Sequence, residues 1–265
     1  MALSIDFEGD FHMHTTYSDG SADVREVIET AASKGLRHMA ITDHMPLPFP
    51  DRYDMRFDAV DRYREEITRL RGDYSDRIGV LLGLEMEYLP GHEAWTEKLL
   101  KRGWEYSIGS VHYMIAGNRR GIVNGTESEF TQLLDGAFGG NIRTLCTHYF
   151  RHQKRLIETG FFTAVGHLDV VKKHNKNNFF FDDRAHWYRE LVLENLERIS
   201  RLQMRVEINV SGFNHPVESP YPAPWIISEC ARLAIPLVVS SDAHRPERIG
   251  GDFNRLKRLL EGLGR

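Results

Sequence analysis

A chain of 265 residues with 41% hydrophobic and 27% charged residues has the composition of an ordinary globular protein and excludes a disordered one. Its net charge of −4 offers no basic footprint, so no nucleic acid partner is expected. The longest apolar runs are too short to span a bilayer, and no secretory signal is visible. Two cysteines in unrelated contexts suggest no disulfide framework. These features together predict a cytoplasmic protein that does not bind membranes.

Short β-like runs alternate with helical periods along the whole chain. Strands are expected over 7–14, 37–42, 77–83, 105–111, 161–166, 205–209 and 236–241. Helices are expected over 23–34, 58–71, 93–102, 142–159, 184–201, 224–233 and 252–263. In the first helix the spacing predicts an N-cap at Asp23, with Glu26 three residues later, and a C-terminal stop at Gly35.

Strands that alternate with helices indicate parallel strands joined by crossover helices. Seven such units predict an α/β fold of the closed or nearly closed barrel type, and a doubly wound open sheet is the alternative. No linker or internal repeat interrupts the pattern, so residues 1–265 are expected to form a single domain.

Residue types that bind metals follow every predicted strand. In a parallel α/β barrel these strand ends lie on one face, where active sites are built. Each motif alone is as easily a helix cap or a hydrogen-bonded core histidine, but their coincidence on one face predicts a metal centre. The residues are, in chain order, His12, His14 and Asp19; Asp43 and His44; Glu85 and Glu87; His112; His167 and Asp169; Glu207 and Asn209; Asp242 and His244.

The chemistry of this set favours divalent ions. Neighbouring buried imidazoles and carboxylates are unstable unless a cation pairs with them. Histidine and carboxylate ligands without cysteine suit Zn, Mn or Fe(II). The set exceeds the capacity of one ion, so two to three divalent ions are expected, and a carboxylate such as Glu85 can bridge two of them. Adjacent ions activate water and neutralise a phosphoryl group during in-line displacement.

The ordered motifs resemble those of the polymerase-and-histidinol-phosphatase (PHP) superfamily of metal-dependent phosphoesterases. They run over nearly the whole chain as "FHMHTTYSDG", "ITDH", "GLEMEY", "YSIGSVHY", "VGHLDVVKK", "EINVSG" and "VVSSDAHRPERIG". The short chain, without a polymerase, is most similar to the histidinol-phosphate phosphatases. The resemblance implies a distorted (β/α)7 barrel, with a trinuclear active site at the C-terminal ends of the strands.

Position by position, the resemblance implies the ligands of each ion, and it implies catalytic roles for Glu85, Asp242 and His112. The first ion would be held by His12, His14, Glu85 and Asp242, the second by Glu85, His112 and His167, and the third by Asp19, His44 and His244.

The resemblance also implies the activity. A metal-bridging hydroxide would hydrolyse L-histidinol phosphate to L-histidinol and phosphate, a step of histidine biosynthesis. Two alternatives stay open: a PHP phosphoesterase for another small phosphomonoester or a nucleotide diester, and a binding protein with a vestigial site. An acidic residue near the third ion, or water, would protonate the leaving alkoxide. The sequence does not indicate an oligomeric state.

Three residues at the rim are candidate contacts for the substrate phosphate: Lys173, His215 and Arg245. Lys173 follows "GHLDVV", and the alternative is that Lys172 and Lys173 begin a solvated helix. The loop of His215 follows the sixth strand on the active face. Other histidines are expected to be surface or core residues away from the site, namely His38, His92, His152, His174 and His186.

Overall fold

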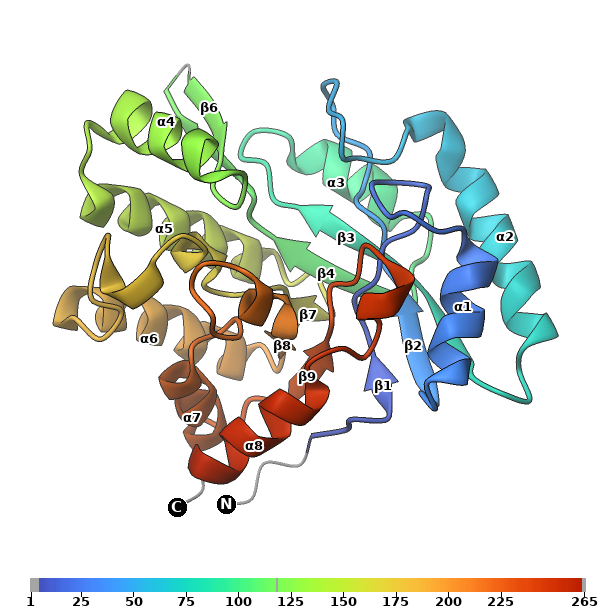
Figure 1. The fold of residues 1–265 in the computed structure, drawn as a ribbon. Helices are drawn as coiled ribbons and strands as arrows, with labels where there is room; N and C mark the ends of the chain where they lie inside the picture. The colour runs from blue at the N-terminus through green and yellow to red at the C-terminus, as the bar shows by residue number, and fades with distance from the viewer. Residues whose placement is uncertain (1–4, 118, 264–265) are drawn as a thin grey trace.

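The computed structural model describes residues 5–117 and 119–263. Within these residues, parallel strands form one sheet of the order β1-β2-β3-β4-β7-β8-β9, which curves into a nearly closed barrel (Figure 1). This confirms the predicted barrel. The strands are β1 (Gly9–Asp10), β2 (His38–Ile41), β3 (Gly79–Glu87), β4 (Tyr106–Ser110), β7 (Ala164–Val165), β8 (Arg205–Asn209) and β9 (Leu237–Ser240).

The barrel closes between the segments that follow β1 and β9. Met13 and Ala243 form an isolated parallel bridge there. The backbone N–H of His14 donates to the carbonyl of Ala243 at 2.9 Å, and the N–H of Ala243 donates to the carbonyl of His12 at 3.3 Å. Because His12, His14 and Asp242 belong to these segments, closure of the barrel brings three predicted metal ligands together.

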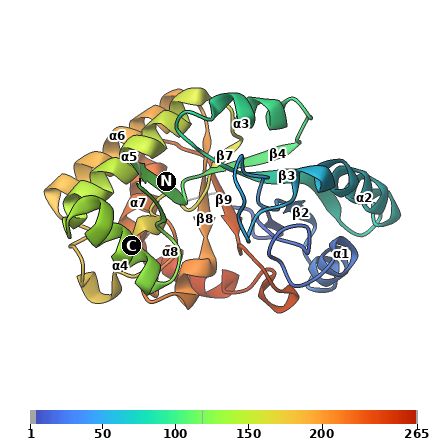
Figure 2. The same ribbon diagram turned by 90° about the horizontal axis from the view of Figure 1, so that it is seen from above.

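Helices surround the strands, with α1 and α2 on one side and α5 and α6 on the other in the view from above (Figure 2). The predicted N-cap is confirmed in α1, where the Asp23 side chain accepts a hydrogen bond from the Glu26 N–H. No helix in the described part of the chain combines the length and apolar character that a membrane span requires. The predicted helices are α1 (Val24–Ser33), α2 (Val60–Asp73), α3 (Glu93–Leu100), α5 (Ile142–Thr159), α6 (His186–Arg201), α7 (Pro224–Arg232) and α8 (Phe253–Leu263).

Two parts of the fold differ from the sequence prediction. Strand β3 continues to Glu87 instead of ending at residue 83, so Glu85 and Glu87 lie within the strand and pair with β4. The segment after β4 forms an antiparallel hairpin of β5 (Tyr113–Ala116) and β6 (Arg119–Ile122), followed by helix α4 (Glu127–Phe138), none of which was predicted. In Figure 1, β6 lies beside α4.

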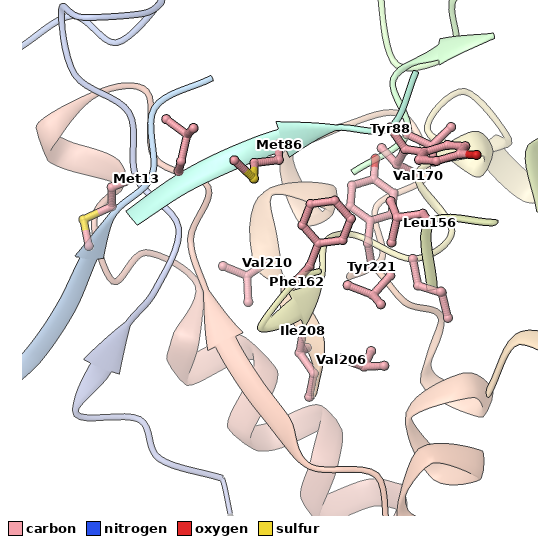
Figure 3. Close-up of a cluster of buried hydrophobic side chains, with 14 of the residues drawn as sticks. Met13, Met86, Tyr88, Leu156, Phe162, Val170, Val206, Ile208, Val210 and Tyr221 are labelled. Carbon is pink, nitrogen blue, oxygen red and sulfur yellow. The ribbon is translucent and has the colours of Figure 1, made fainter. Parts of the chain in front are cut away.

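The barrel interior is packed and is not a channel. The side chains of a small buried cluster come from different strands, so they can meet only inside the barrel. The cluster consists of Ala40, Tyr106, Ile108 and Ala164, and Phe11, Leu81 and Val238 pack against it. Figure 3 shows another part of the core, with Met86, Phe162 and Ile208. A Cβ at Gly109 would lie 2.6 Å from the Phe162 ring, so β4 needs glycine there.

Lys172 ends a short 3₁₀ helix, η2 (Val170–Lys172), and is only 1% exposed. Its Nζ lies 3.0 Å from Asp169 Oδ2 and donates to the carbonyl of Pro220 at 3.0 Å. The interpretation of Lys172 as the start of a solvated helix is therefore wrong. The same Asp169 oxygen accepts the N–H of Ala223, so the ion pair connects the turn after β7 to the start of α7.

We predict that Lys172→Met lowers the free energy of unfolding by about 3–5 kcal/mol, because it leaves the Asp169 carboxylate buried without its counter-charge. The matched control is Lys154→Met, which removes the more exposed Lys154–Glu194 pair and should cost about 1 kcal/mol or less. Urea unfolding of both variants measures the difference. Equal losses would contradict the prediction.

Candidate metal centre

A cavity of about 420 Å³ opens at the C-terminal ends of the strands. Its wall brings together most of the predicted ligands, from segments far apart in the sequence: Asp19, His44, Glu85, His112, His167, Asp242 and His244. His12 and His14 are buried directly beside them. Three overlapping groups of ligand atoms each lie within 4.8 Å of one another: His14, Asp19, His44 and His244; His12, His14 and Glu85; His44, Glu85 and His112.

The Glu85 carboxylate lies at the centre of the imidazoles. Its Oε2 is 2.8 Å from His44 Nδ1 and 3.2 Å from His12 Nε2. Its Oε1 is 3.0 Å from His167 Nε2 and 3.4 Å from His112 Nε2. Burial alone would raise the pKa of Glu85, but the imidazoles, His12 first, hold that pKa well below its usual range. The carboxylate therefore stays ionised and can bind cations on both of its oxygens.

A second group of imidazoles surrounds the carboxylate of Asp19. Its Oδ1 lies 3.3 Å from His244 Nε2, 3.7 Å from His14 Nδ1 and 3.8 Å from His44 Nε2. A Cβ at Gly20 would lie 2.4 Å from the carbonyl oxygen of His14, so only glycine lets this turn pack closely enough to direct Asp19 at the cavity.

Asp242 faces the barrel seam. Its Oδ1 lies 3.3 Å from His14 Nε2 and 3.6 Å from His12 Nε2. Its Oδ2 accepts hydrogen bonds from Asn209 Nδ2 at 3.1 Å and Ser211 Oγ at 3.3 Å. The backbone of Asp242 is left-handed, with φ of 53°, which costs energy for a residue other than glycine and places the carboxylate at the site.

Two further carboxylates orient the histidines. His12 Nδ1–H donates to Glu207 Oε1 at 2.6 Å, and His112 Nδ1–H donates to Glu87 Oε2 at 2.8 Å. Each bond leaves Nε2 free to bind an ion. The sequence places Glu87 and Glu207 at strand ends among the metal-type residues, but it does not reveal that they orient histidines. For Glu87 a signal was present, because the period-2 alternation of a strand places residues 85 and 87 on the same face, and in the structure both carboxylates contact His112.

The residues fit divalent ions. His12 Nε2, His14 Nε2 and Asp19 Oδ1 are buried and have no hydrogen-bond partner among the described residues. Such orphaned atoms are unstable unless something pairs with them. They belong to the overlapping ligand groups, and a cation would satisfy them. The nitrogen and oxygen donor set suits Zn, Mn or Fe.

The rim carries some of the predicted substrate contacts. Lys173 lines the cavity, and its Nζ donates to the carbonyl of Asn124 at 2.5 Å. His215 also lines it, with Nδ1 3.1 Å from the Tyr221 hydroxyl. Arg245 instead lines an adjacent cavity of about 260 Å³, which shares His215, Asp242 and His244 with the first.

The position of His174 differs from the sequence prediction. His174, expected away from the site, lines the cavity and donates from Nε2 to the carbonyl of Gly125 at 2.9 Å. Together, Lys173 and His174 fasten the loop before α4 to the cavity wall.

We predict that Glu207→Gln weakens metal retention about 10- to 100-fold. In the native site, Glu207 Oε1 accepts a hydrogen bond from His12, and Oε2 accepts one from the backbone N–H of His167 at 2.6 Å. Glutamine has one acceptor oxygen and one NH₂ group, so it can accept only one of these two hydrogen bonds. Dialysis against graded chelator with elemental analysis measures the loss. Glu190→Gln on the exposed face of α6 is the control. Unchanged retention in Glu207→Gln would show that this carboxylate does not tune the site.

Known proteins resemble this chain over most of its length. The family model described as the PHP domain matches residues 10–211. A "probable histidinol-phosphatase" of Deinococcus radiodurans is 32% identical over 260 residues, covering 96% of this chain and 93% of the relative.

Two solved structures share the fold. A candidate histidinol phosphatase of Listeria monocytogenes has a TM-score of 0.86 at 20% identity, covering 93% of this chain and 99% of its own. The histidinol phosphate phosphatase of Lactococcus lactis, complexed with Zn, L-histidinol and phosphate, has a TM-score of 0.77 at 21% identity, covering 98% and 95%. With the family model matching most of its residues, this chain belongs to the PHP domain family.

Proposed function

We propose that this protein is a metal-dependent phosphomonoesterase that hydrolyses L-histidinol phosphate to L-histidinol and phosphate. We also propose that residues 1–265 form one domain. The observation that carries the proposal is the convergence of orphaned, buried nitrogen and oxygen atoms on one cavity. The full-length similarity to a probable histidinol-phosphatase supports the choice of substrate. The cavity volume of about 420 Å³ suits a small molecule.

Two to three divalent ions, Mn, Fe or Zn, are the proposed cofactors, and the Zn of the Lactococcus relative supports this class. When bound, such ions lower the pKa of water and neutralise charge on phosphoryl oxygens. The presence of Glu85 in two of the ligand groups supports a bridging role. The proposed ligands are His12, His14, Glu85 and Asp242 for one ion, Glu85, His112 and His167 for the second, and Asp19, His44 and His244 for the third.

Glu85, Asp242 and His112 are the proposed catalytic residues. Burial would raise the pKa of Asp242, but His12 and His14 hold it well below its usual range, so the carboxylate is ionised. Asn209 and Ser211 fix its Oδ2, so its Oδ1, which faces His12 and His14, is the oxygen that would bind an ion. His112 is fixed from behind by Glu87 and presents Nε2 to the cavity.

We predict that protein produced with Mn, Fe or Zn carries two to three equivalents of metal and prefers L-histidinol phosphate over generic monoesters by about tenfold or more in kcat/KM. Chelation should abolish the activity. Elemental analysis and a steady-state screen with L-histidinol phosphate, simple monoesters and a nucleotide diester test this. Full activity of metal-free protein in chelator would refute the metal site, and preference for the diester would refute the substrate class.

We predict that Lys173→Met lowers kcat/KM about tenfold to several hundredfold, or about 1.5–3 kcal/mol, the range for a hydrogen bond to a charged group. Lys173 lines the cavity beside Asp242, and its ammonium can donate to a phosphoryl oxygen. Metal content should not change. Lys176→Met, in the exposed pair with Glu218, is the matched control. If Lys173→Met behaves like the parent enzyme, His215 and Arg245 are the next candidates for the phosphate contact.

A further inference from the structure

Asp54 lies between β2 and α2 and lines the cavity that holds the proposed metal ligands. Its Oδ2 is buried and has no hydrogen-bond partner among the described residues. The imidazole of His44, which lies in the same cavity wall, contacts Glu85 and Asp19 and not Asp54. Asp54 thus lines the cavity with its Oδ2 lacking a hydrogen-bond partner among the described residues, and His44 opposes its negative charge only from a distance.

The other acids of this cavity are already engaged. Asp19, Glu85 and Asp242 each lie within 4.0 Å of two or more imidazole nitrogens. Asp54 belongs to none of the ligand groups that could hold a metal ion in residues 5–117 and 119–263. A further divalent ion is therefore a poor partner for Asp54, because a lone carboxylate provides too few ligands.

The surroundings of Asp54 favour a cation. Burial, opposed by His44 and reinforced by Asp51 and Glu87, raises the pKa of Asp54 to about 8. The Tyr113 hydroxyl donates to Asp51, which leaves Asp54 as the unpaired acid of this segment. A cation that entered the cavity and bound Asp54 would favour the ionised form of this carboxyl and lower its pKa.

The chemistry of the wall suits an ammonium group better than a guanidinium or a metal. An ammonium is a compact point charge that one carboxylate can bind, and aromatic faces attract it further. Tyr53 and Tyr113 line the cavity together with Asp54. Lys173 lines the same cavity, so the wall offers a cationic group for phosphate as well as an anionic group for an amine.

We infer that Asp54 is the specificity-determining residue that binds the ammonium group on the leaving alcohol, so that the site selects phosphate esters of amino alcohols over neutral ones. The inference rests on the proposed function, because L-histidinol phosphate carries its amine on the carbon next to the ester carbon. A rival role for Asp54 is proton donation to the leaving alkoxide. That role would serve every alkyl phosphate equally, whereas recognition of the amine serves only esters that carry one.

The test compares two esters that differ by the amine alone: L-histidinol phosphate and its deaminated analogue, imidazolylpropyl phosphate. The metal-loaded parent enzyme, Asp54→Asn and Asp51→Asn are assayed with both. Asp51→Asn is the matched control, because it removes the same charge from the same segment at a carboxylate that Tyr113 already engages. Metal content and Tm of Asp54→Asn show whether the fold and the metal centre are intact.

We expect Asp54→Asn to lower kcat/KM for L-histidinol phosphate about 10- to 100-fold and for the deaminated ester less than about threefold, with metal content and Tm unchanged. Asp51→Asn should leave the ratio between the two esters as in the parent. Equal losses for both esters in Asp54→Asn, or no loss for either, would overturn the inference while leaving the proposed function standing. A parent enzyme inactive on both esters would refute the proposed function and, with it, this inference.

Discussion

The buried carboxylate of Glu85 is the constraint on which the site depends. Imidazole nitrogens of His12, His44, His112 and His167 lie within 3.4 Å of its two oxygens. These histidines follow β1, β2, β4 and β7, so the contacts exist only when the strands are in register around the barrel. Burying this much charge is unfavourable by itself, and the packed barrel interior and the cations of the proposed metal centre would offset the cost together.

A second set of polar residues holds the first in place. Asp43 accepts hydrogen bonds from the backbone N–H and hydroxyl of both Thr15 and Ser18, which fixes the turn that carries Asp19. Asp10 accepts the N–H groups of Ser241 and Gly250 and fixes the turn that carries Asp242 and His244. The acids near the strand ends therefore divide into those that can bind ions and those that shape the backbone around them.

The sequence predicts the barrel, and the histidines and acids that gather on its cavity face, because each signal is local. A strand, a helical period and a His-x-His pair can be recognised within a few residues, and the barrel topology then brings the strand ends together. Helix α4 carried a local signal that was missed: Thr126 and Glu129 form a capping box. The burial of Lys172 could not be predicted, because its partner carbonyl at Pro220 belongs to a segment that only the fold brings near.

Asp54 could not be found from the sequence for a different reason. That reason distinguishes the proposed metal ligands from the proposed substrate contacts. The metal ligands are coupled to one another through barrel closure, so their pattern along the chain is strict. Asp54 lies in the long connection between β2 and α2 and belongs to no recognisable motif, and Lys173 follows η2, where a backbone carbonyl holds it. Under the proposal, substitution at these wall positions changes which ester is bound without altering the proposed metal ligands. If Asp54 and Lys173 bind the substrate as proposed, substrate choice is encoded where sequence patterns are weakest, while the proposed hydrolytic chemistry is encoded where they are strongest.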